Sequence, residues 1–141
     1  MGAWGEGPFD NDTAADWSAA FADVGGPAGI ELVEEALRAA AETGEDDYLE
    51  SHEGALALAA AELVAAVRGM DVERSPYNRA ALAWVAASRP DAGSGTVSLA
   101  VGALERVLAP ESELVELWED AGTATWRPLV EDRLRSLRAL R

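Results

Sequence analysis

The chain of 141 residues contains no cysteine and no lysine, and His52 is its single histidine. Without cysteine there are no disulfides, no thiolate nucleophiles and no zinc–thiolate sites. One histidine rules out metal sites built on a histidine pair, and it disfavours a Ser-His-Asp or Cys-His mechanism. Without lysine there is no Walker-type phosphate loop and no Schiff-base chemistry. These absences remove many catalytic mechanisms and leave carboxylates and arginines as the main charged groups.

Long apolar runs are also missing. No segment is apolar over the ~20 residues that a membrane-spanning helix needs. The first residues lack a basic region followed by an apolar stretch, which is the pattern of a secretory signal peptide. We therefore expect a cytoplasmic location and no membrane contact.

Positive charge is scarce in the first half of the chain. The formal net charge is −15, and residues 1–67 carry fifteen carboxylates against Arg38 alone. Residues 68–141 carry eleven carboxylates and ten arginines, so they are nearly neutral. This balance disfavours nucleic-acid binding, which relies on attraction to phosphates. An acidic half can steer a cationic partner, although it can also serve solubility alone.

The apolar residues recur with a helical period in seven segments, and no convincing alternating strand is present. The length suits one domain, and 49% apolar residues with five tryptophans can form a core. We predict an all-α fold, a compact single-domain bundle of about six to seven helices over residues 1–141. The most apolar segment, from about Ser51 or Glu53 to Arg68, is expected at its centre.

Local signals place the ends of several helices. The first helix is expected from Asp12 or Thr13, with Thr13 and Asp16 resembling a capping box. Ser75 and Pro76 read as the N-cap and first residue of a fourth helix, with Tyr77 facing inward. The last helix is expected to direct Leu129 toward the core together with its other apolar residues.

Glu62 is the one polar residue in an otherwise apolar run from Ala55 to Val67. A buried carboxylate without partners costs several kcal/mol or takes up a proton. We therefore predict a partner for Glu62: an arginine, a tryptophan indole N–H or backbone N–H groups of the N-terminal arm. Three roles stay open, namely a polar anchor in the core, a ligand-binding or catalytic carboxylate, or a surface position.

The opening MGAWGEGPFDNDTAADW is predicted to be an ordered arm, residues 1–11, packed on the bundle. Trp4, Phe9 and Trp17 are its packing residues, because such large apolar rings gain by leaving water. Glycines between them allow close approach to neighbouring backbone.

An acidic cluster spans the end of the arm and the start of the first helix: Asp10, Asn11, Asp12 and Asp16. These residues either cap the first helix or surround a ligand or cation. A calcium loop of the EF-hand type fits poorly, because Ala15 occupies the position of the required glycine.

The connection EDDYLESHEG is strongly acidic and contains His52. Three interpretations stay open: a docking surface for a cationic protein, weak binding of Ca²⁺ or Mg²⁺, and a solvated loop. We predict no cofactor and no metal. The residues of the predicted partner surface are Glu45, Asp46, Asp47, Glu50 and Glu53.

Three stretches together resemble the bacterial family called domain of unknown function 4259. They are MGAWGEGPFDNDTAADW, ALALAAAELVAAVRG, which contains Glu62, and SELVELWEDAG, which contains Trp118. The resemblance implies a small helical protein, common in actinobacteria, with no established activity. It assigns no catalytic residue.

The sequence favours a non-catalytic interaction or regulatory protein whose acidic half faces a basic partner protein. One alternative is an immunity-type inhibitor that covers the basic cleft of a toxin. Another is a carboxylate-based protein that binds a metal or small ligand through Glu62 and the Asp10–Asp16 cluster. No catalytic residue is nominated, which favours a non-enzymatic role, and the oligomeric state stays open.

Overall fold

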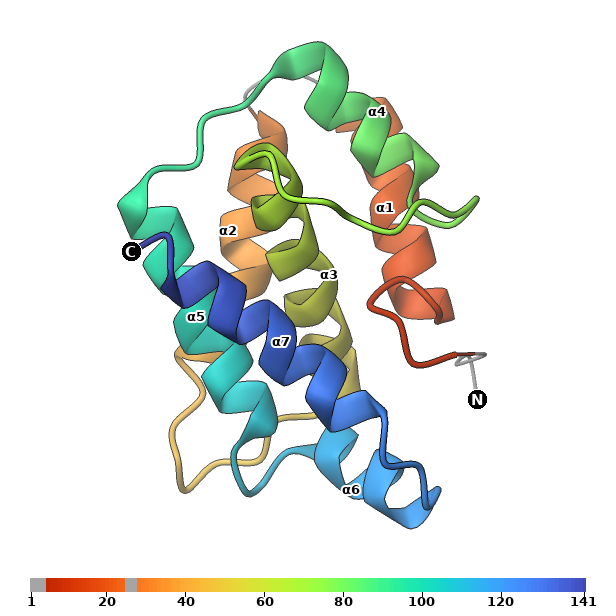
Figure 1. The fold of residues 1–141 in the computed structure, drawn as a ribbon, viewed down its shortest axis with the longest axis vertical. Coiled ribbons are helices and arrows are strands. Elements are labelled where there is room, and N and C mark those ends of the chain that lie inside the picture. Colours follow the sequence, from red (N-terminus) through yellow and green to blue (C-terminus); the bar gives the residue numbers. More distant parts are fainter. Residues whose placement is uncertain (1–4, 25–27) are drawn as a thin grey trace.

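The computed structural model describes residues 5–24 and 28–141, and within these ranges it contains seven α-helices and no β-strand (Figure 1). The prediction of an all-α fold is therefore confirmed. None of these helices is both long and apolar enough to cross a membrane. The helices are α1 Asp12–Val24, α2 Ala28–Ala41, α3 Ser51–Val67, α4 Arg79–Ser88, α5 Ser94–Leu108, α6 Glu113–Asp120 and α7 Trp126–Arg138.

Helix α3 is the centre of the bundle, because it contacts every other helix of the described chain. Its residues from Gly54 to Ala65 are buried on all sides, apart from the half-buried Leu56. Alanines make up much of this stretch, and their small side chains let neighbouring helices approach closely. The prediction of a central, alanine-rich helix is confirmed.

The other helices surround α3 in pairs (Figure 1). Helices α2 and α5 pack together on one side of it, and α1 and α4 pack together on the other. Helix α7 crosses α5 and α3, and α6 lies at the end of the bundle near the connection between α2 and α3. Trp118 of α6 and Trp126 of α7 stack with ring centroids 6.3 Å apart.

Aromatic rings join α1 to α4. The ring of Phe21 lies 4.7 Å from that of Trp84 and 5.0 Å from that of Trp17, centroid to centroid. The indole of Trp84 also covers Gly29 at the start of α2, where a Cβ atom would overlap the ring. A single tryptophan therefore links three helices, and it requires glycine at this point of α2.

Helix α1 begins at Asp12, as predicted, but its cap differs from the predicted capping box. The side-chain oxygen of Asn11 accepts a hydrogen bond from the N–H of Ala14 at 2.8 Å. Asn11 is thus the N-cap residue, and Thr13 and Asp16 already lie within the helix. The predicted capping box is wrong because a better cap precedes it by two residues.

Helix α4 begins at Arg79, three residues later than the Ser-Pro pair suggests. The Oδ1 atom of Asn78 accepts a hydrogen bond from the N–H of Ser75, and its Nδ2 donates to the carbonyl of Glu73. These bonds hold Ser75 and Pro76 in a turn before the helix. Tyr77 is exposed in that turn, so the expectation that it faces inward is wrong.

Gly29→Ala is expected to destabilise the protein by about 2 kcal/mol, because overlap with the Trp84 indole outweighs the better helix propensity of alanine. Thermal or urea unfolding measures the change. Gly95→Ala is the matched control, since no atom lies within 4 Å of the added Cβ. Equal stability of both variants would contradict the packing of Trp84 on α2.

Candidate functional site

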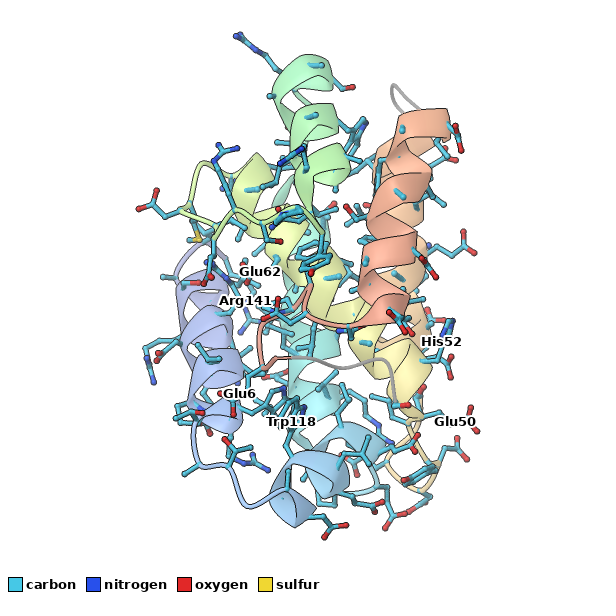
Figure 2. The ribbon with its side chains drawn as sticks, turned by 90° about the vertical axis from the view of Figure 1, so that its right-hand side faces the viewer. Glu6, Glu50, His52, Glu62, Trp118 and Arg141 are labelled. Carbon is cyan, nitrogen blue, oxygen red and sulfur yellow. The ribbon has the colours of Figure 1, made fainter. Side chains whose placement is uncertain are left out.

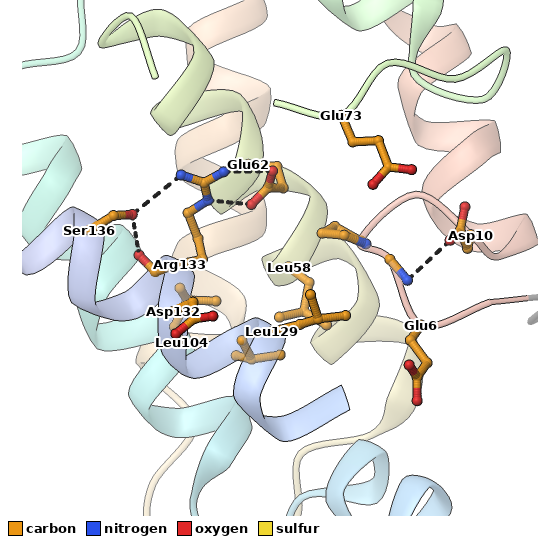
Figure 3. Close-up of a pocket in the computed structure, with 13 residues that line it drawn as sticks. Glu6, Asp10, Leu58, Glu62, Glu73, Leu104, Leu129, Asp132, Arg133 and Ser136 are labelled. Atoms are coloured by element: carbon orange, nitrogen blue, oxygen red, sulfur yellow. Dashed lines mark hydrogen bonds and ion pairs between the residues drawn. The ribbon is translucent and has the colours of Figure 1, made fainter. Parts of the chain in front are cut away.

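A cavity of about 380 Å³ lies between α3, α7 and residues 5–11, which we call the N-terminal segment (Figure 3). One part of its lining is apolar, and it includes Leu58 of α3 and Leu129 of α7. The other part is charged and contains five carboxylates and one guanidinium. These ionisable residues are Glu6, Asp10, Glu62, Glu73, Asp132 and Arg133.

Glu62 forms an ion pair with Arg133 of α7. Nε donates to Oε1 at 2.5 Å and Nη2 donates to Oε2 at 3.2 Å, which is a two-point contact of the kind that arginine makes best. The side chains are 10% and 20% exposed. Of the three partners that the sequence allowed for Glu62, the structure provides the arginine.

The remaining N–H groups of Arg133 are also used within the protein. Nη2 donates to the carbonyl of Asp71 at 3.1 Å, and Nη1 donates to Ser136 Oγ at 3.3 Å and to Met70 Sδ at 3.5 Å. Since all its donors have protein acceptors, Arg133 offers none to a bound anion. The pair acts as a polar link between α3 and α7, and the carboxylates dominate the charge of the cavity.

Glu6 ties the N-terminal segment to the connection between α6 and α7. Its two carboxylate oxygens accept hydrogen bonds from the hydroxyls of Thr123 and Thr125. These bonds favour the charged form and lower the pKa of Glu6 below its ordinary value. Phe9, a few residues on, is buried in the core with 4% exposure. Trp4 lies outside the described residues, and Trp17 packs against the core from α1.

The residues of the acidic cluster serve separate local roles. Asn11 caps α1, and Asp10 accepts a hydrogen bond from the N–H of Gly7 at 3.1 Å. Asp12 and Asp16 are exposed on α1. Asp10 alone of the four joins Glu62 in the lining of the cavity. Over residues 5–24 and 28–141, no group of three or more aspartate, glutamate or histidine side chains is arranged to hold a metal ion.

A buried arginine, Arg106 of α5, organises the acidic connection between α2 and α3. Its residue exposure is 6%, and its guanidinium donates hydrogen bonds to five backbone carbonyls from two loops. Nε donates to the carbonyl of Thr43 at 3.0 Å, and Nη2 donates to that of Asp47 at 2.6 Å. The other acceptors are the carbonyls of Gly44, Pro110 and Glu111.

Backbone pairing completes this junction. The N–H of Leu49 donates to the carbonyl of Glu111 at 2.8 Å, and the N–H of Glu113 donates to the carbonyl of Leu49 at 2.9 Å. A carboxylate oxygen of Glu113 accepts from the N–H of Ser51 at 2.7 Å and so caps α3. The acidic connection is therefore fixed along its backbone.

The junction creates an acidic face from two distant parts of the sequence. Glu50 lies on this face, and its carboxylate and the ring of neighbouring His52 point outward in Figure 2. Within the part of the chain that the structure describes, no carboxylate of the face lies within 4 Å of a cationic group. The acidic face consists of Glu45, Asp46, Asp47, Glu50, Glu53, Glu111, Glu113 and Glu116.

Tyr48 joins the acidic connection to α6. Its hydroxyl donates a hydrogen bond to Glu116 at 2.7 Å. This bond, followed by burial and by the charges of Glu116, Glu113 and Glu111, raises the pKa of Tyr48 to about 12. The hydrogen bond therefore places Tyr48 of the acidic connection beside the carboxylates at the start of α6.

Arg106 and its partners were missed by the sequence reasoning. The one signal for a buried arginine was the position of Arg106 between the apolar residues Leu104 and Val107. That signal is weak, because the neighbouring charged residue Glu105 in the same interval is exposed. The carbonyl groups that accept these bonds could not be predicted, because every residue has the same backbone carbonyl whatever its side chain.

Comparison with known proteins identifies a family. The model of the domain of unknown function DUF4259 matches residues 2–128, and the chain therefore belongs to that family. No curated protein and no solved structure matches the chain.

Arg106→Gln is expected to lower the free energy of unfolding by about 3 kcal/mol, because buried carbonyls lose their donors. Amide hydrogen exchange over residues 43–50 should accelerate at the same time. Arg138→Gln, which breaks the exposed pair with Glu105, is the control and should cost under about 1 kcal/mol. We call the five hydrogen bonds from the Arg106 guanidinium to backbone carbonyls the carbonyl clamp. Full stability of Arg106→Lys would contradict its importance, since lysine keeps the charge but cannot reproduce the planar set of five donors.

A double-mutant cycle of Glu62→Gln and Arg133→Gln should give a coupling energy of about 2 kcal/mol in urea unfolding. The reason is that each single change leaves a largely buried charged partner. The exposed pair Glu105 and Arg138 provides the comparison cycle, with an expected coupling below about 1 kcal/mol. Additive effects at Glu62 and Arg133 would show that the pair does not hold α3 to α7.

Proposed function

We propose that this member of the DUF4259 family is a non-catalytic interaction protein whose acidic face binds a protein with a basic surface. The observation that carries the proposal is the carbonyl clamp of Arg106. It fixes the backbone of the acidic connection without using any carboxylate of the face. Apart from one oxygen of Glu113, which caps α3, and one of Glu116, which binds Tyr48, the carboxylates of the face stay available for a partner.

Rigidity favours such binding. A flexible acidic loop loses conformational entropy when a partner orders it, whereas a fixed one avoids most of that cost. Here α5, through Arg106, and α6, through Glu113, hold both edges of the connection. The backbone that carries these carboxylates is thus held in one arrangement.

The charge distribution favours a basic partner. Eight carboxylates belong to the acidic face, and the hydrogen bond to Glu116, together with the charges of Glu116, Glu113 and Glu111, raises the pKa of Tyr48. Complementary charge raises the association rate and selects against acidic partners, and both effects weaken as salt increases. A partner with exposed arginines or lysines matches this surface.

The test is an affinity capture with the purified protein as bait, performed at low and at high salt. The variant Glu45→Gln, Asp46→Asn, Glu50→Gln removes three charges from the acidic face. Losing three charge pairs at about 0.5 kcal/mol each should weaken binding of a captured protein about tenfold. High salt should release that protein from the unaltered bait.

The control is Asp16→Asn, Asp23→Asn, Glu35→Gln, which removes the same charge from exposed positions on α1 and α2. It should retain the captured protein. Equal loss with both variants would mean attraction by net charge, and equal retention would mean binding elsewhere. Either result contradicts a role for the acidic face.

A further inference from the structure

We propose that the cavity between the N-terminal segment, α3 and α7 binds a small aliphatic amine, with its ammonium among the carboxylates and its chain along the leucines. This site is separate from the acidic face and does not depend on the interaction proposed above. Its volume of about 380 Å³ falls within the range of about 300–1,000 Å³ typical of small-ligand sites.

The apolar part of the cavity lining favours a ligand with a hydrocarbon chain. Leu58 and Val130 are largely buried, with 8% and 6% exposure, and they line the cavity with Leu129. Leu129 is 48% exposed, so the expectation that it faces the core is wrong. An apolar chain lying against Leu129 would remove this surface from water, which is favourable in proportion to the area covered.

The polar groups of the cavity select a cation. Arg133 donates all its N–H groups to Glu62 and other protein acceptors, so an anionic head group finds no donor there. The carboxylate of Glu73 accepts no hydrogen bond from the described residues, and Asp10 uses one carboxylate oxygen for the N–H of Gly7. These carboxylates retain acceptor capacity that an ammonium group, with three donors, can fill.

The two parts of the lining are placed to bind one amphipathic molecule. In Figure 3, Glu73 and Asp10 lie on the side of the N-terminal segment, and Leu58 and Leu129 lie between them and Asp132 of α7. Asp132 is already paired with Arg135 at 2.7 Å. The ammonium is therefore assigned to the side of Glu73 and Asp10, and the chain extends over the leucines toward α7.

The test uses three probes with the same six-carbon chain: hexylamine, hexanol and hexanoate. Each is titrated into the full-length protein while amide chemical shifts are followed by NMR. Hexylamine should shift the amides of Gly7, Leu58 and Leu129 and saturate. Hexanol should bind more weakly by about tenfold, because its head lacks the charge–carboxylate contacts. Hexanoate should not bind.

Variants separate the site from general attraction to an acidic protein. Glu73→Gln should weaken hexylamine about tenfold and leave hexanol unchanged. Leu129→Ala should weaken both by about threefold. Glu131→Gln is the matched control, since Glu131 is exposed on α7 and does not line the cavity. All three positions are on the surface, so unfolding curves should stay close to that of the unaltered protein.

Two results would overturn the proposal. If Glu131→Gln weakens hexylamine as much as Glu73→Gln, the amine follows the net charge and not the cavity. If hexanol binds as tightly as hexylamine, the carboxylates do not select a cation. Neither result bears on the acidic face, because the three substitutions lie outside it.

Discussion

Burial of α3 on all sides is the constraint on which the rest of the structure depends. A helix without a solvent face must be covered by every other helix of the described bundle, and any charge within it must be neutralised. Glu62 meets that condition through Arg133, which places α7 across α3. The ion pair also forms one end of the cavity lining. Arg133 turns toward the central helix, and Leu129, one turn earlier on α7, stays at the surface, so both residues line the cavity.

Two arginines, the half-buried Arg133 and the buried Arg106, connect the nearly neutral second half of the chain to the acidic first half, each in its own way. Arg133 binds a carboxylate, so a charge of the first half is cancelled within the protein. Arg106 binds backbone carbonyls, so the loop is fixed and its carboxylates remain outward. The pairing of halves therefore stabilises the bundle without neutralising the acidic face. Arg106 therefore leaves the carboxylates of the acidic face without a cationic partner, whereas Arg133 neutralises Glu62 inside the bundle.

The two candidate sites would use negative charge in different ways. The acidic face offers many exposed carboxylates on a fixed backbone, an arrangement suited to a large basic surface and sensitive to salt. The cavity offers few carboxylates beside an apolar wall, an arrangement suited to one small amphipathic cation. The N-terminal segment belongs to the second site, because Gly7 and Asp10 line the cavity and Glu6 secures the segment to the connection before α7.

The sequence by itself determined the helical class, the central place of the alanine-rich helix and the need of Glu62 for a partner, because periodicity and burial cost are properties of short segments. It misplaced the start of α4, where the side chain of Asn78 holds the preceding residues in a turn. Only the tertiary structure decided that Arg133 pairs with Glu62, 71 residues away, and that Arg106 binds the carbonyls of Thr43 and Asp47. Such contacts depend on how the helices pack, and backbone acceptors have no side-chain signature, so no local pattern encodes them.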